Sequence, residues 1–260
     1  MDGLGEMRVA PIAGMPLFAA GQSVAGEIVA ALALAGEALE DGDICVVAQK
    51  IVSKSEGRTV RLADVEPGKE AQAIAAETAR DPAHVQLVLD ESSAILRAKP
   101  AAIIACHRTG HVLANAGIDA SNVDSAGGET VLLWPVDPDA SARAIRSELW
   151  ALTGRNVGVV IADSMGRAWR IGTVGTAIGC AGITVLDDRR GRATDLFGRT
   201  LQATVIAIAD SLAAMAALAM GEGDEGTPAA LVRGGARWVT QEDGPGAAAA
   251  LRPLAEDMFR

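Results

Sequence analysis

The feature that most constrains the fold is a continuous apolar run over residues 156–162, which is followed at once by Asp163. A run of this length is short for a helix and is typical of a central, buried β-strand. A second buried strand is expected over Ile44–Ala48, directly after the turn Asp41-Gly42-Asp43. These two strands anchor the fold that the sequence predicts.

Hairpin signals accompany the buried strands. Ala101–Cys106 and His111–Asn115 flank Thr109-Gly110, a pair typical of a tight turn between antiparallel strands. This mixture of hairpins and crossovers favours an α+β fold with mixed sheets and helices, in a single unit over 1–260. The other expected elements are strands at Arg8–Ala13, Leu201–Ala209 and Pro228–Val232, helices at Gly26–Leu39, Glu70–Arg80, His84–Glu91, Asp210–Met220 and Ala247–Asp257, a helix capped at Asp137 that runs to about Leu152, and loops at 116–130, 163–199 and 221–227.

Composition excludes several classes of function. The net charge of −10 argues against a general phosphate-neutralising surface for nucleic acid. No uninterrupted apolar stretch approaches the ~18 residues of a membrane span, because Asp210 breaks the richest one, so we expect no membrane insertion. Three widely spaced cysteines fit neither a disulfide framework nor a zinc site, and predict buried thiols in a reducing cytoplasm.

Acidic residues at strand ends are the strongest candidates for chemistry. Asp119 lies in a loop, Asp163 and Ser164 follow the central strand, and Glu222 lies in a glycine-rich loop. If these groups converge, their oxygens would suit Mg²⁺ or Mn²⁺. The alternative is that the aspartates are turn or cap residues and that Glu222 is a solvated loop charge.

Two further segments have features that suit the binding of an anion. Gly221, Gly223 and Gly226 would let backbone N–H groups approach an anion, although a flexible turn has the same composition. Neither a P-loop nor a dinucleotide fingerprint is present. Lys50 and Lys54, two of only four lysines, follow a buried strand, where they would contact phosphate or lie in a solvated turn.

Six of the 19 arginines fall within 33 residues. Such a cluster in an acidic protein suits the recognition of carboxylate or phosphate, and the alternative is ion pairing with nearby aspartates. Trp169, inside this cluster, is a candidate to lie near a substrate or in the core. His107 and His111 flank the hairpin turn, so we expect them to be solvated rather than catalytic. The clustered residues are Arg167, Arg170, Arg189, Arg190, Arg192 and Arg199.

Several segments carry a resemblance to a known family. The run from Asn115 to Asn122, Asn-Ala-Gly-Ile-Asp-Ala-Ser-Asn, is the most specific of them. The sequence resembles the coenzyme F420-0:L-glutamate ligases, or gamma-glutamyl ligases, from about residue 8 to residue 235. The other matching segments are Gly14–Pro16, Asp41–Asp43, Ser53–Arg58, Asp137–Ser141, Asp163–Arg167, Gly172–Gly175, Asp195–Arg199 and Met220–Gly223.

The resemblance implies a GTP-dependent ligase that adds L-glutamate to the terminal carboxylate of coenzyme F420-0 and extends a gamma-linked tail. It implies two Mg²⁺ or Mn²⁺ ions, a monovalent cation such as K⁺, two interwoven subdomains and an intertwined homodimer. Residues that match the family's metal ligands are Asp119, Asp163, Ser164 and Glu222. Residues that match its GTP contacts are Ala13, Gly14, Met15, Pro16, Gln49, Lys50, Lys54, Asn122, Met220, Gly221, Glu222, Gly223, Asp224, Glu225, Gly226 and Thr227.

The sequence also departs from the family pattern. The common Asp-Thr-x-Gly motif reads Asp163-Ser164-Met165-Gly166 here, and both hydroxyls can ligate a metal. Gln49-Lys50 occupies a position that varies in the family. We expect no fused nitroreductase-like domain of the kind that some bacterial relatives carry.

The implied chemistry agrees with the residues. Phosphoryl transfer from GTP would turn a carboxylate into an acyl phosphate, which needs positioning and charge neutralisation more than a protein nucleophile. On this hypothesis Asp119, Asp163 and Glu222 hold the metals, and Lys50, Lys54 and the Gly221–Gly226 backbone hold the phosphates. The arginines at 167–199, including Arg167 and Arg170, receive the anionic acceptor tail or glutamate. The alternatives are a related carboxylate–amine ligase with another acceptor, and a nucleotide-binding protein without turnover.

Overall fold

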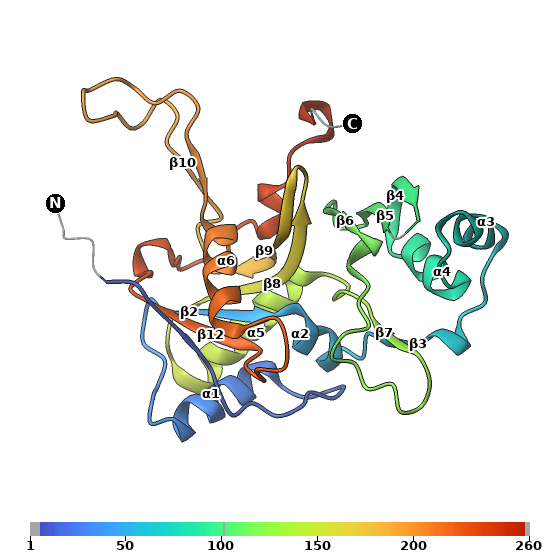
Figure 1. Cartoon of the computed structure of the whole chain (residues 1–260). Coiled ribbons are helices and arrows are strands. Elements are labelled where there is room, and N and C mark those ends of the chain that lie inside the picture. Colours follow the sequence, from blue (N-terminus) through green and yellow to red (C-terminus); the bar gives the residue numbers. More distant parts are fainter. Residues whose placement is uncertain (1–5, 101, 258–260) are drawn as a thin grey trace.

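The two apolar runs lie side by side at the centre of a five-stranded sheet in the computed structural model, which describes residues 6–100 and 102–257 (Figure 1). The strand order is β1-β12-β2-β8-β9. β2 and β8 are parallel, with Ala48 opposite Ala162, and the other neighbours are antiparallel. The bounds are β1 Arg8–Pro11, β12 Ala229–Arg233, β2 Ile44–Ala48, β8 Gly158–Arg167 and β9 Arg170–Ala181.

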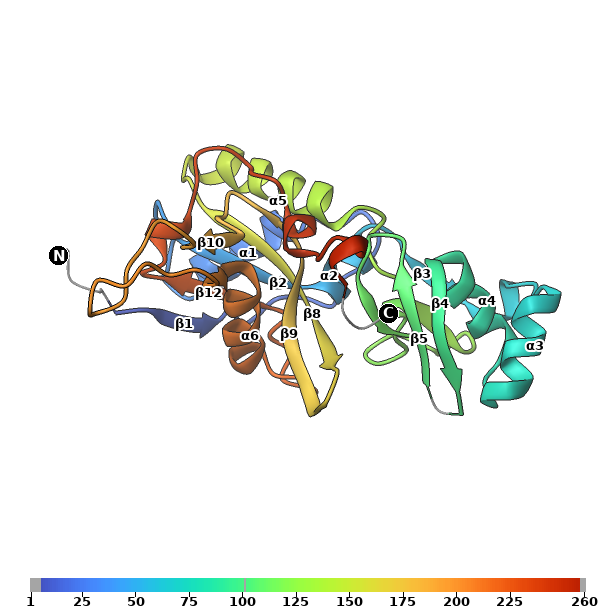
Figure 2. The same ribbon diagram turned by 90° about the horizontal axis from the view of Figure 1, so that it is seen from above.

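Helices cover both faces of this sheet, as Figure 2 shows. On one face lie α1 (Val24–Leu34) and α5 (Pro138–Thr153), and on the other lies α6 (Ile208–Met220). Alternate residues of a strand point to opposite faces. In β2, Cys45 and Val47 therefore join the core with α1 and α5, while Ile44 and Val46 join the core with α6. Burial on both sides explains why these strands are apolar without interruption.

Glycines in β9 let both helical layers approach the sheet closely. A Cβ on Gly175 would overlap the Ala213 carbonyl oxygen of α6, and one on Gly179 would overlap the Pro138 carbonyl oxygen of α5. Residues four apart in a regular strand share a face, but a bulge next to Ile178 shifts the register here. The two glycines therefore serve opposite faces of the sheet.

A smaller lobe packs beside the large one around its own apolar core. α2, which follows β2 directly, lies next to the junction of the two lobes. At the other end of the molecule, β10 and β11 form the base of an arm that projects away from the body (Figure 1). The bounds are α2 Gln49–Ser55, β3 Thr59–Arg61, α3 Lys69–Thr78, α4 Pro82–Asp90, β4 Ser92–Lys99, β5 Ala102–His107, β6 Val112–Ala114, β7 Thr130–Leu132, β10 Leu186–Asp188 and β11 Val205–Ala207. Short 3₁₀ turns span Leu62–Asp64, Asn115–Gly117, Ala236–Trp238, Ala247–Ala250 and Leu254–Glu256.

The predicted α+β class and the two central strands are confirmed. The strand predicted over Leu201–Ala209 is wrong in extent, because only Val205–Ala207 pairs with another strand. The helix predicted over Ala247–Asp257 is also wrong: it consists of two 3₁₀ turns separated by Leu251 to Pro253. Pro253 has no N–H to continue a helix. The hairpin strand predicted from Ala101 begins at Ala102, and Ala101 lies outside the described residues.

Several elements were not predicted, among them the short strands β3, β7 and β10. β8 continues through Asp163 to Arg167 and turns directly into β9, where a loop was expected, because the pairing of the two strands outweighs the glycines in the sequence. α2 follows Ile44–Ala48, where the sequence leaves open phosphate contacts or a solvated turn, and β4 pairs with β5. None of the helices in the described residues combines the length and the apolar character that crossing a membrane requires. The interwoven subdomains and the homodimer stay predictions.

Gly175→Ala tests the close packing of α6 on β9. The added methyl group meets backbone rather than a flexible side chain. We therefore expect the free energy of unfolding to fall by about 1–3 kcal/mol. Gly166→Ala in β8 is the matched control, because its Cβ would meet open space, and it should change stability by less than ~0.5 kcal/mol. Urea unfolding measures both. Equal stabilities for the two variants would contradict this account of the packing.

Candidate active site

Several predicted site segments meet at one end of the central sheet. The Ile12 amide donates to the Ala229 carbonyl at 2.8 Å, which places residues 13–16 beside the start of β12. The Ala48 amide donates to the Pro228 carbonyl at 2.8 Å, so α2 begins next to the loop 221–227. Asp163 and Ser164 follow Ala162, which pairs with Ala48. The sheet therefore gathers four separate parts of the sequence.

Two lysines on α2 connect this end of the sheet to the loop from the smaller lobe. Lys50 forms an ion pair with Asp119 and donates to the Ser121 hydroxyl at 2.6 Å. Lys54, one helical turn later, donates to the Asn122 carbonyl at 2.6 Å. Burial and the charge of Lys50 lower the pKa of Lys54. Like charges at this spacing weaken a helix, so an anion placed near both ammonium groups would be stabilised.

The loop that carries Asp119 has an unusual backbone. Asn115, Ala116 and Gly117 have φ of 52°, 51° and 75°, and Asn122 has φ of 56°. A left-handed conformation at a non-glycine residue costs on the order of 1–3 kcal/mol and persists only where the surroundings impose it. The Asp119 amide and carbonyl pair with Leu132 at 3.2 and 2.8 Å. This pairing fixes the aspartate beside α2.

Asp163 is held by two N–H donors. The indole Nε1 of Trp134 donates to one carboxylate oxygen at 2.8 Å, and the backbone N–H of Ser164 donates to the other at 2.9 Å. Burial raises the pKa of Asp163 to about 6, although these two donors and the charge of Lys50 oppose that rise. The charge of Asp119 adds to it. Asp163 is thus a carboxylate whose surroundings favour an additional cation.

The pKa of Asp119 is shifted in the opposite direction to that of Asp163. Burial acts to raise its pKa, but hydrogen bonds from Lys50 and Ser121 together with the charge of Lys50 outweigh burial, and the pKa is lowered. Ser121 donates to Asp119 through its amide at 2.7 Å and through its hydroxyl at 2.8 Å. Asp119 is therefore ionised and oriented over the neutral pH range.

The glycine-rich loop closes the other side of the site. Ser164 donates its hydroxyl to Glu222, and Asn122 donates its side-chain amide to the Gly223 carbonyl at 3.1 Å. Within the loop, the Gly223 amide donates to the Glu225 carboxylate at 2.7 Å, and backbone N–H groups lower the pKa of Glu225. Thr227 donates to the Met220 carbonyl at 2.7 Å. The N–H groups of this loop thus already face an anionic group.

The donors present match a hard divalent cation in chemical type. Asp119, Asp163 and Glu222 offer carboxylate oxygens and Ser164 offers a hydroxyl, which are ligands that Mg²⁺ and Mn²⁺ accept. Within residues 6–100 and 102–257, no three His, Cys, Asp or Glu side chains stand in a ready-made metal cluster. Hydrogen bonds to Lys50, Trp134 and the Ser164 hydroxyl occupy these oxygens instead. Cation binding would therefore require a local exchange of partners.

Comparison with known proteins identifies the family. A sequence model of the F420-0:gamma-glutamyl ligase family matches residues 14–234. The chain belongs to the F420-0:gamma-glutamyl ligase family. It is 47% identical over 249 residues to the coenzyme F420:L-glutamate ligase of Methanothermobacter thermautotrophicus, covering 96% of this chain and 97% of that protein. It is 42% identical to the proteins of that name from Methanopyrus kandleri and Methanocaldococcus jannaschii, over 100% and 98% of each chain.

Not all the residues predicted to contact GTP turn toward the site of this ligase family member. The Gln49 side chain is buried and donates to the Ser53 hydroxyl at 2.6 Å, so it is used inside the core. Met220, the last residue of α6, is buried in the core on that face of the sheet, and the partly buried Met15 packs against the opposite core. The other members of the set lie at the surface or in contact with solvent, namely Ala13, Gly14, Pro16, Lys50, Lys54, Asn122, Gly221, Glu222, Gly223, Asp224, Glu225, Gly226 and Thr227.

The arginine cluster divides between two projections. Arg167 and Arg170 face one another at the end of the β8–β9 hairpin, and Trp169 between them is 88% exposed, so it is not a core residue. Arg189 and Arg190 pair with Asp187 and Asp188 at 2.8 and 2.7 Å on the arm, which is the ion-pairing alternative. Arg192 and Arg199 also lie on the arm. Only the first pair belongs to the β8–β9 hairpin: Arg167 ends β8, the strand that carries Asp163 and Ser164, and Arg170 begins β9.

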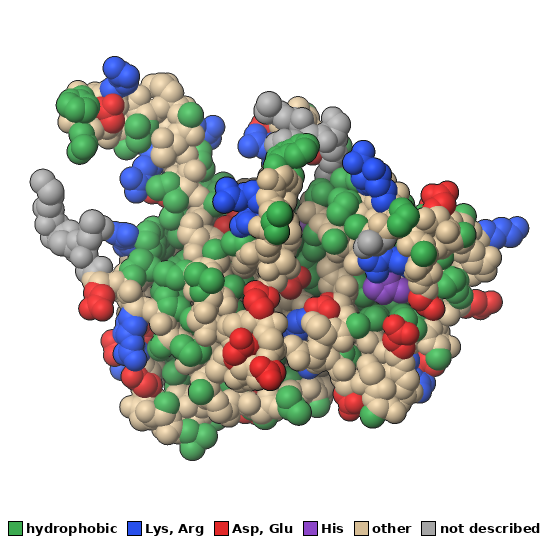
Figure 3. All heavy atoms as spheres, viewed as in Figure 1, with side chains coloured by type: hydrophobic (Ala, Val, Ile, Leu, Met, Phe, Trp, Pro, Cys, Tyr) green, Lys and Arg blue, Asp and Glu red, His purple; other side chains and the backbone are tan. Residues whose placement is uncertain are grey.

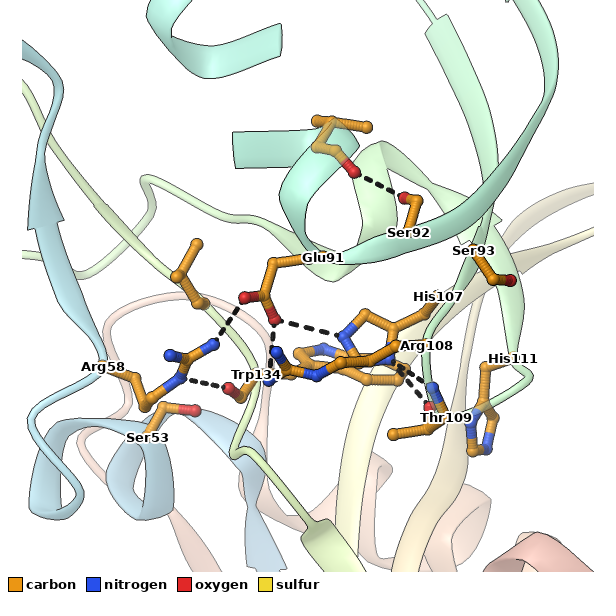
Figure 4. A network of polar contacts seen from close by, with 12 residues as sticks. Ser53, Arg58, Glu91, Ser92, Ser93, His107, Arg108, Thr109, His111 and Trp134 are labelled. Carbon is orange, nitrogen blue, oxygen red and sulfur yellow. Dashed lines mark hydrogen bonds and ion pairs between the residues drawn. The ribbon is translucent and has the colours of Figure 1, made fainter. Parts of the chain in front are cut away.

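The prediction that His107 and His111 are solvated is wrong. Both are buried, and their rings pack against Trp134 at centroid distances of 4.9 and 5.4 Å (Figure 4). The Thr109 hydroxyl lies between their Nδ1 atoms, at 2.8 and 2.9 Å. Arg108 and Gly110 of the turn are exposed, but the two imidazole rings are buried against Trp134, which the local sequence does not indicate.

Two residues of the site were not predicted from the sequence. Ser121 stands two residues after Asp119, and this spacing is a signal for a side chain that caps its own loop. Trp134 carries no such signal, because it contacts Asp163 only through the folded sheet. Both residues orient the acidic groups of this family member.

His111 predicts an acid-sensitive fold. Burial, followed by the charge of His107, lowers the pKa of His111 to about 4. Below pH ~6.5 the unfolded chain takes up a proton that the folded chain takes up only near pH 4. Stability should therefore fall as the pH drops through this window, by on the order of 3 kcal/mol for this group.

The variant His111→Phe keeps a ring against Trp134 and removes the titrating group. We expect its unfolding free energy to fall less steeply than that of the wild type between pH 6.5 and 4, as measured by urea unfolding at each pH. The difference between the two curves removes the contributions of other groups, including Glu91 and His84. Parallel curves would show that His111 does not produce the effect.

Proposed function

We propose that this chain joins L-glutamate to the terminal carboxylate of coenzyme F420-0 in a GTP-dependent reaction, and that it extends a gamma-linked tail. The observation that carries the proposal is the meeting of two lysines, three carboxylates and a glycine-rich loop at one end of the sheet. Positive groups for phosphates and oxygen ligands for cations are what phosphoryl transfer requires. The names of the relatives support the choice of glutamate and F420 as substrates.

The proposed reaction has two balanced steps. A carboxylate oxygen of the acceptor attacks the γ-phosphorus of GTP, and GDP leaves to give an acyl phosphate. The amine of glutamate then attacks the carbonyl carbon, phosphate leaves, and the nitrogen loses a proton to form the amide. Neither step needs a protein nucleophile, so the work of the chain is to position groups and neutralise charge.

The residues of the chain divide this work. Lys50 and Lys54 would hold the phosphates, together with N–H groups of the loop 221–227. Asp119, Asp163, Ser164 and Glu222 would hold two Mg²⁺ or Mn²⁺ ions, with a monovalent cation such as K⁺ nearby. When bound, these ions would neutralise the phosphate oxygens. When the substrates bind, the Lys50 ammonium would exchange Asp119 for a phosphate. Asp119 would then pair with a divalent cation, so both side chains would keep a partner of opposite charge.

The end of the β8–β9 hairpin would receive the acceptor. Arg167 and Arg170 are exposed, three and six residues beyond Ser164, and have the forked geometry that suits carboxylates and phosphodiesters. Trp169 offers an exposed ring between them. These side chains would place the anionic end of the acceptor toward Ser164.

We also propose that the chain forms a homodimer and acts in the cytoplasm. Leu196 and Phe197 are 98% and 96% exposed at the tip of the projecting arm, where hydrophobic side chains gather (Figure 3). Exposed apolar side chains on a projection are typical of an interface. The cytoplasmic location rests on the three buried free thiols.

Asp163→Asn tests the proposed reaction. GDP release should require both F420-0 and glutamate in the wild type, and mass spectrometry should detect added glutamate. The variant should lose at least about 100-fold in rate at limiting Mn²⁺, as expected when a metal ligand loses its charge. Asp64→Asn, a surface residue paired with Arg61, is the matched control and should act as the wild type.

Each negative result would contradict a different part of the proposal. Glutamylation of a different acceptor would favour a related carboxylate–amine ligase. Tight GTP binding without GDP release would indicate a binding protein without turnover. Wild-type rates for Asp163→Asn would contradict the assignment of Asp163.

The double variant Leu196→Ser and Phe197→Ser tests the dimer. We expect the wild type to sediment as a dimer at micromolar concentration, and the variant to dissociate at concentrations at least about tenfold higher, since two buried apolar side chains would be lost. Leu34→Ser is the control, because Leu34 is also strongly exposed, at 85%, but lies at the end of α1, away from the arm. A wild-type monomer, or an unchanged dimer in the double variant, would contradict the proposal.

A further inference from the structure

Trp134 links the candidate metal-binding carboxylate to the junction of the lobes. Its side chain is completely buried, and its indole Nε1 donates to Asp163. Its carbonyl accepts a hydrogen bond from Arg58 Nε at 2.9 Å. We propose that Trp134 is a positioning residue that fixes the Asp163 carboxylate for the binding of a divalent cation. This inference rests on the proposed function of Asp163.

The geometry around Asp163 leaves one defined orientation. The Trp134 indole N–H meets one oxygen at 2.8 Å and the Ser164 amide meets the other at 2.9 Å. A carboxylate has about four lone-pair directions, so each oxygen retains one for a further ligand. Rotation of the carboxylate would break both bonds at once. A donor behind a ligating carboxylate typically changes metal affinity by about 10–100-fold.

The indole is itself immobilised from three sides. The rings of His107 and His111 pack against it, with interplanar angles of 53° and 81°. Gly117 lies against the edge that carries Nε1, and any Cβ there would overlap that nitrogen. The left-handed backbone of Gly117, with φ of 75°, makes this approach accessible. The N–H therefore points to Asp163 without a competing rotamer.

A cluster of ion pairs holds the backbone of Trp134. Arg58 donates to its carbonyl and to Glu91 at 2.8 Å, and Arg108 pairs with Glu91 at 3.0 Å (Figure 4). His107 Nε2 faces the same carboxylate at 3.5 Å. Glu91 follows α4 in the smaller lobe, whereas Asp163 lies on β8 in the larger one. Contacts between the two lobes thus position Trp134, and Trp134 positions the Asp163 carboxylate.

Trp134→Phe removes the N–H and retains a ring between the histidines. Mn²⁺ binding, measured directly by electron paramagnetic resonance without nucleotide or acceptor, should weaken by about tenfold or more. Trp238→Phe is the matched control, since Trp238 contacts Arg237 elsewhere, and it should bind Mn²⁺ as the wild type does. Activity of Trp134→Phe should recover as Mn²⁺ is raised. Unchanged Mn²⁺ affinity in a folded Trp134→Phe protein would overturn the proposal.

A second measurement avoids any change at Trp134. NMR of the tryptophan indole N–H groups provides this measurement. The resonances of Trp150, Trp169 and Trp238 are assigned from their Phe variants, and the remaining indole resonance belongs to Trp134. Asp163→Asn should shift this resonance strongly, because a charged acceptor becomes neutral, while Asp64→Asn should not. No shift would overturn the proposal. Absence of glutamylation in the wild type would instead contradict the proposed function and leave both measurements readable.

Discussion

The burial of two parallel strands on both faces is the constraint on which the rest of the structure depends. β2 and β8 have no polar side to offer to solvent, so α1 and α5 must cover one face and α6 the other. Parallel strands end at the same edge of a sheet. The chain that leaves β2 therefore starts α2, with its two lysines, at the edge where β8 presents Asp163 and Ser164. The chemistry of the site follows from this shared edge.

Charge balance at that edge explains how an acidic protein can hold anionic substrates. Lys50 compensates Asp119, while Asp163 is only partly compensated, and burial raises its pKa to about 6. The glycine-rich loop binds a carboxylate of its own, Glu225, through backbone N–H groups. Each charge at the site thus has a temporary partner of the kind that phosphates and divalent cations would replace. Exchange of partners costs less than leaving a buried charge without a partner.

The sequence predicts the parts of this site that depend on local chemistry and misses the parts that depend on packing. Asp163 and Glu222 are visible because a carboxylate after a buried run, or between glycines, stands out against its neighbours. α2 and β9 are not visible, because pairing and packing with distant segments override weak local preference. His107 and His111 look solvated beside a turn, but the local Thr109 hydroxyl satisfies their Nδ1 atoms, and Glu91 and Trp134, brought by other elements, surround the rings. The family resemblance predicts which residues are ligands, but it does not predict their geometry.

Small residues connect the packing of the large lobe to the site. Gly175 pairs with Ser164 across β8 and β9, and the missing side chain of Gly175 lets α6 touch the strand at Ala213. α6 ends at Met220, two residues before Glu222, which accepts the Ser164 hydroxyl. A side chain at position 175 would move α6 outward and take Glu222 away from Ser164. Abundant alanine and glycine give each helix little apolar area to bury. The same small residues therefore also set the distance between Glu222 and Ser164.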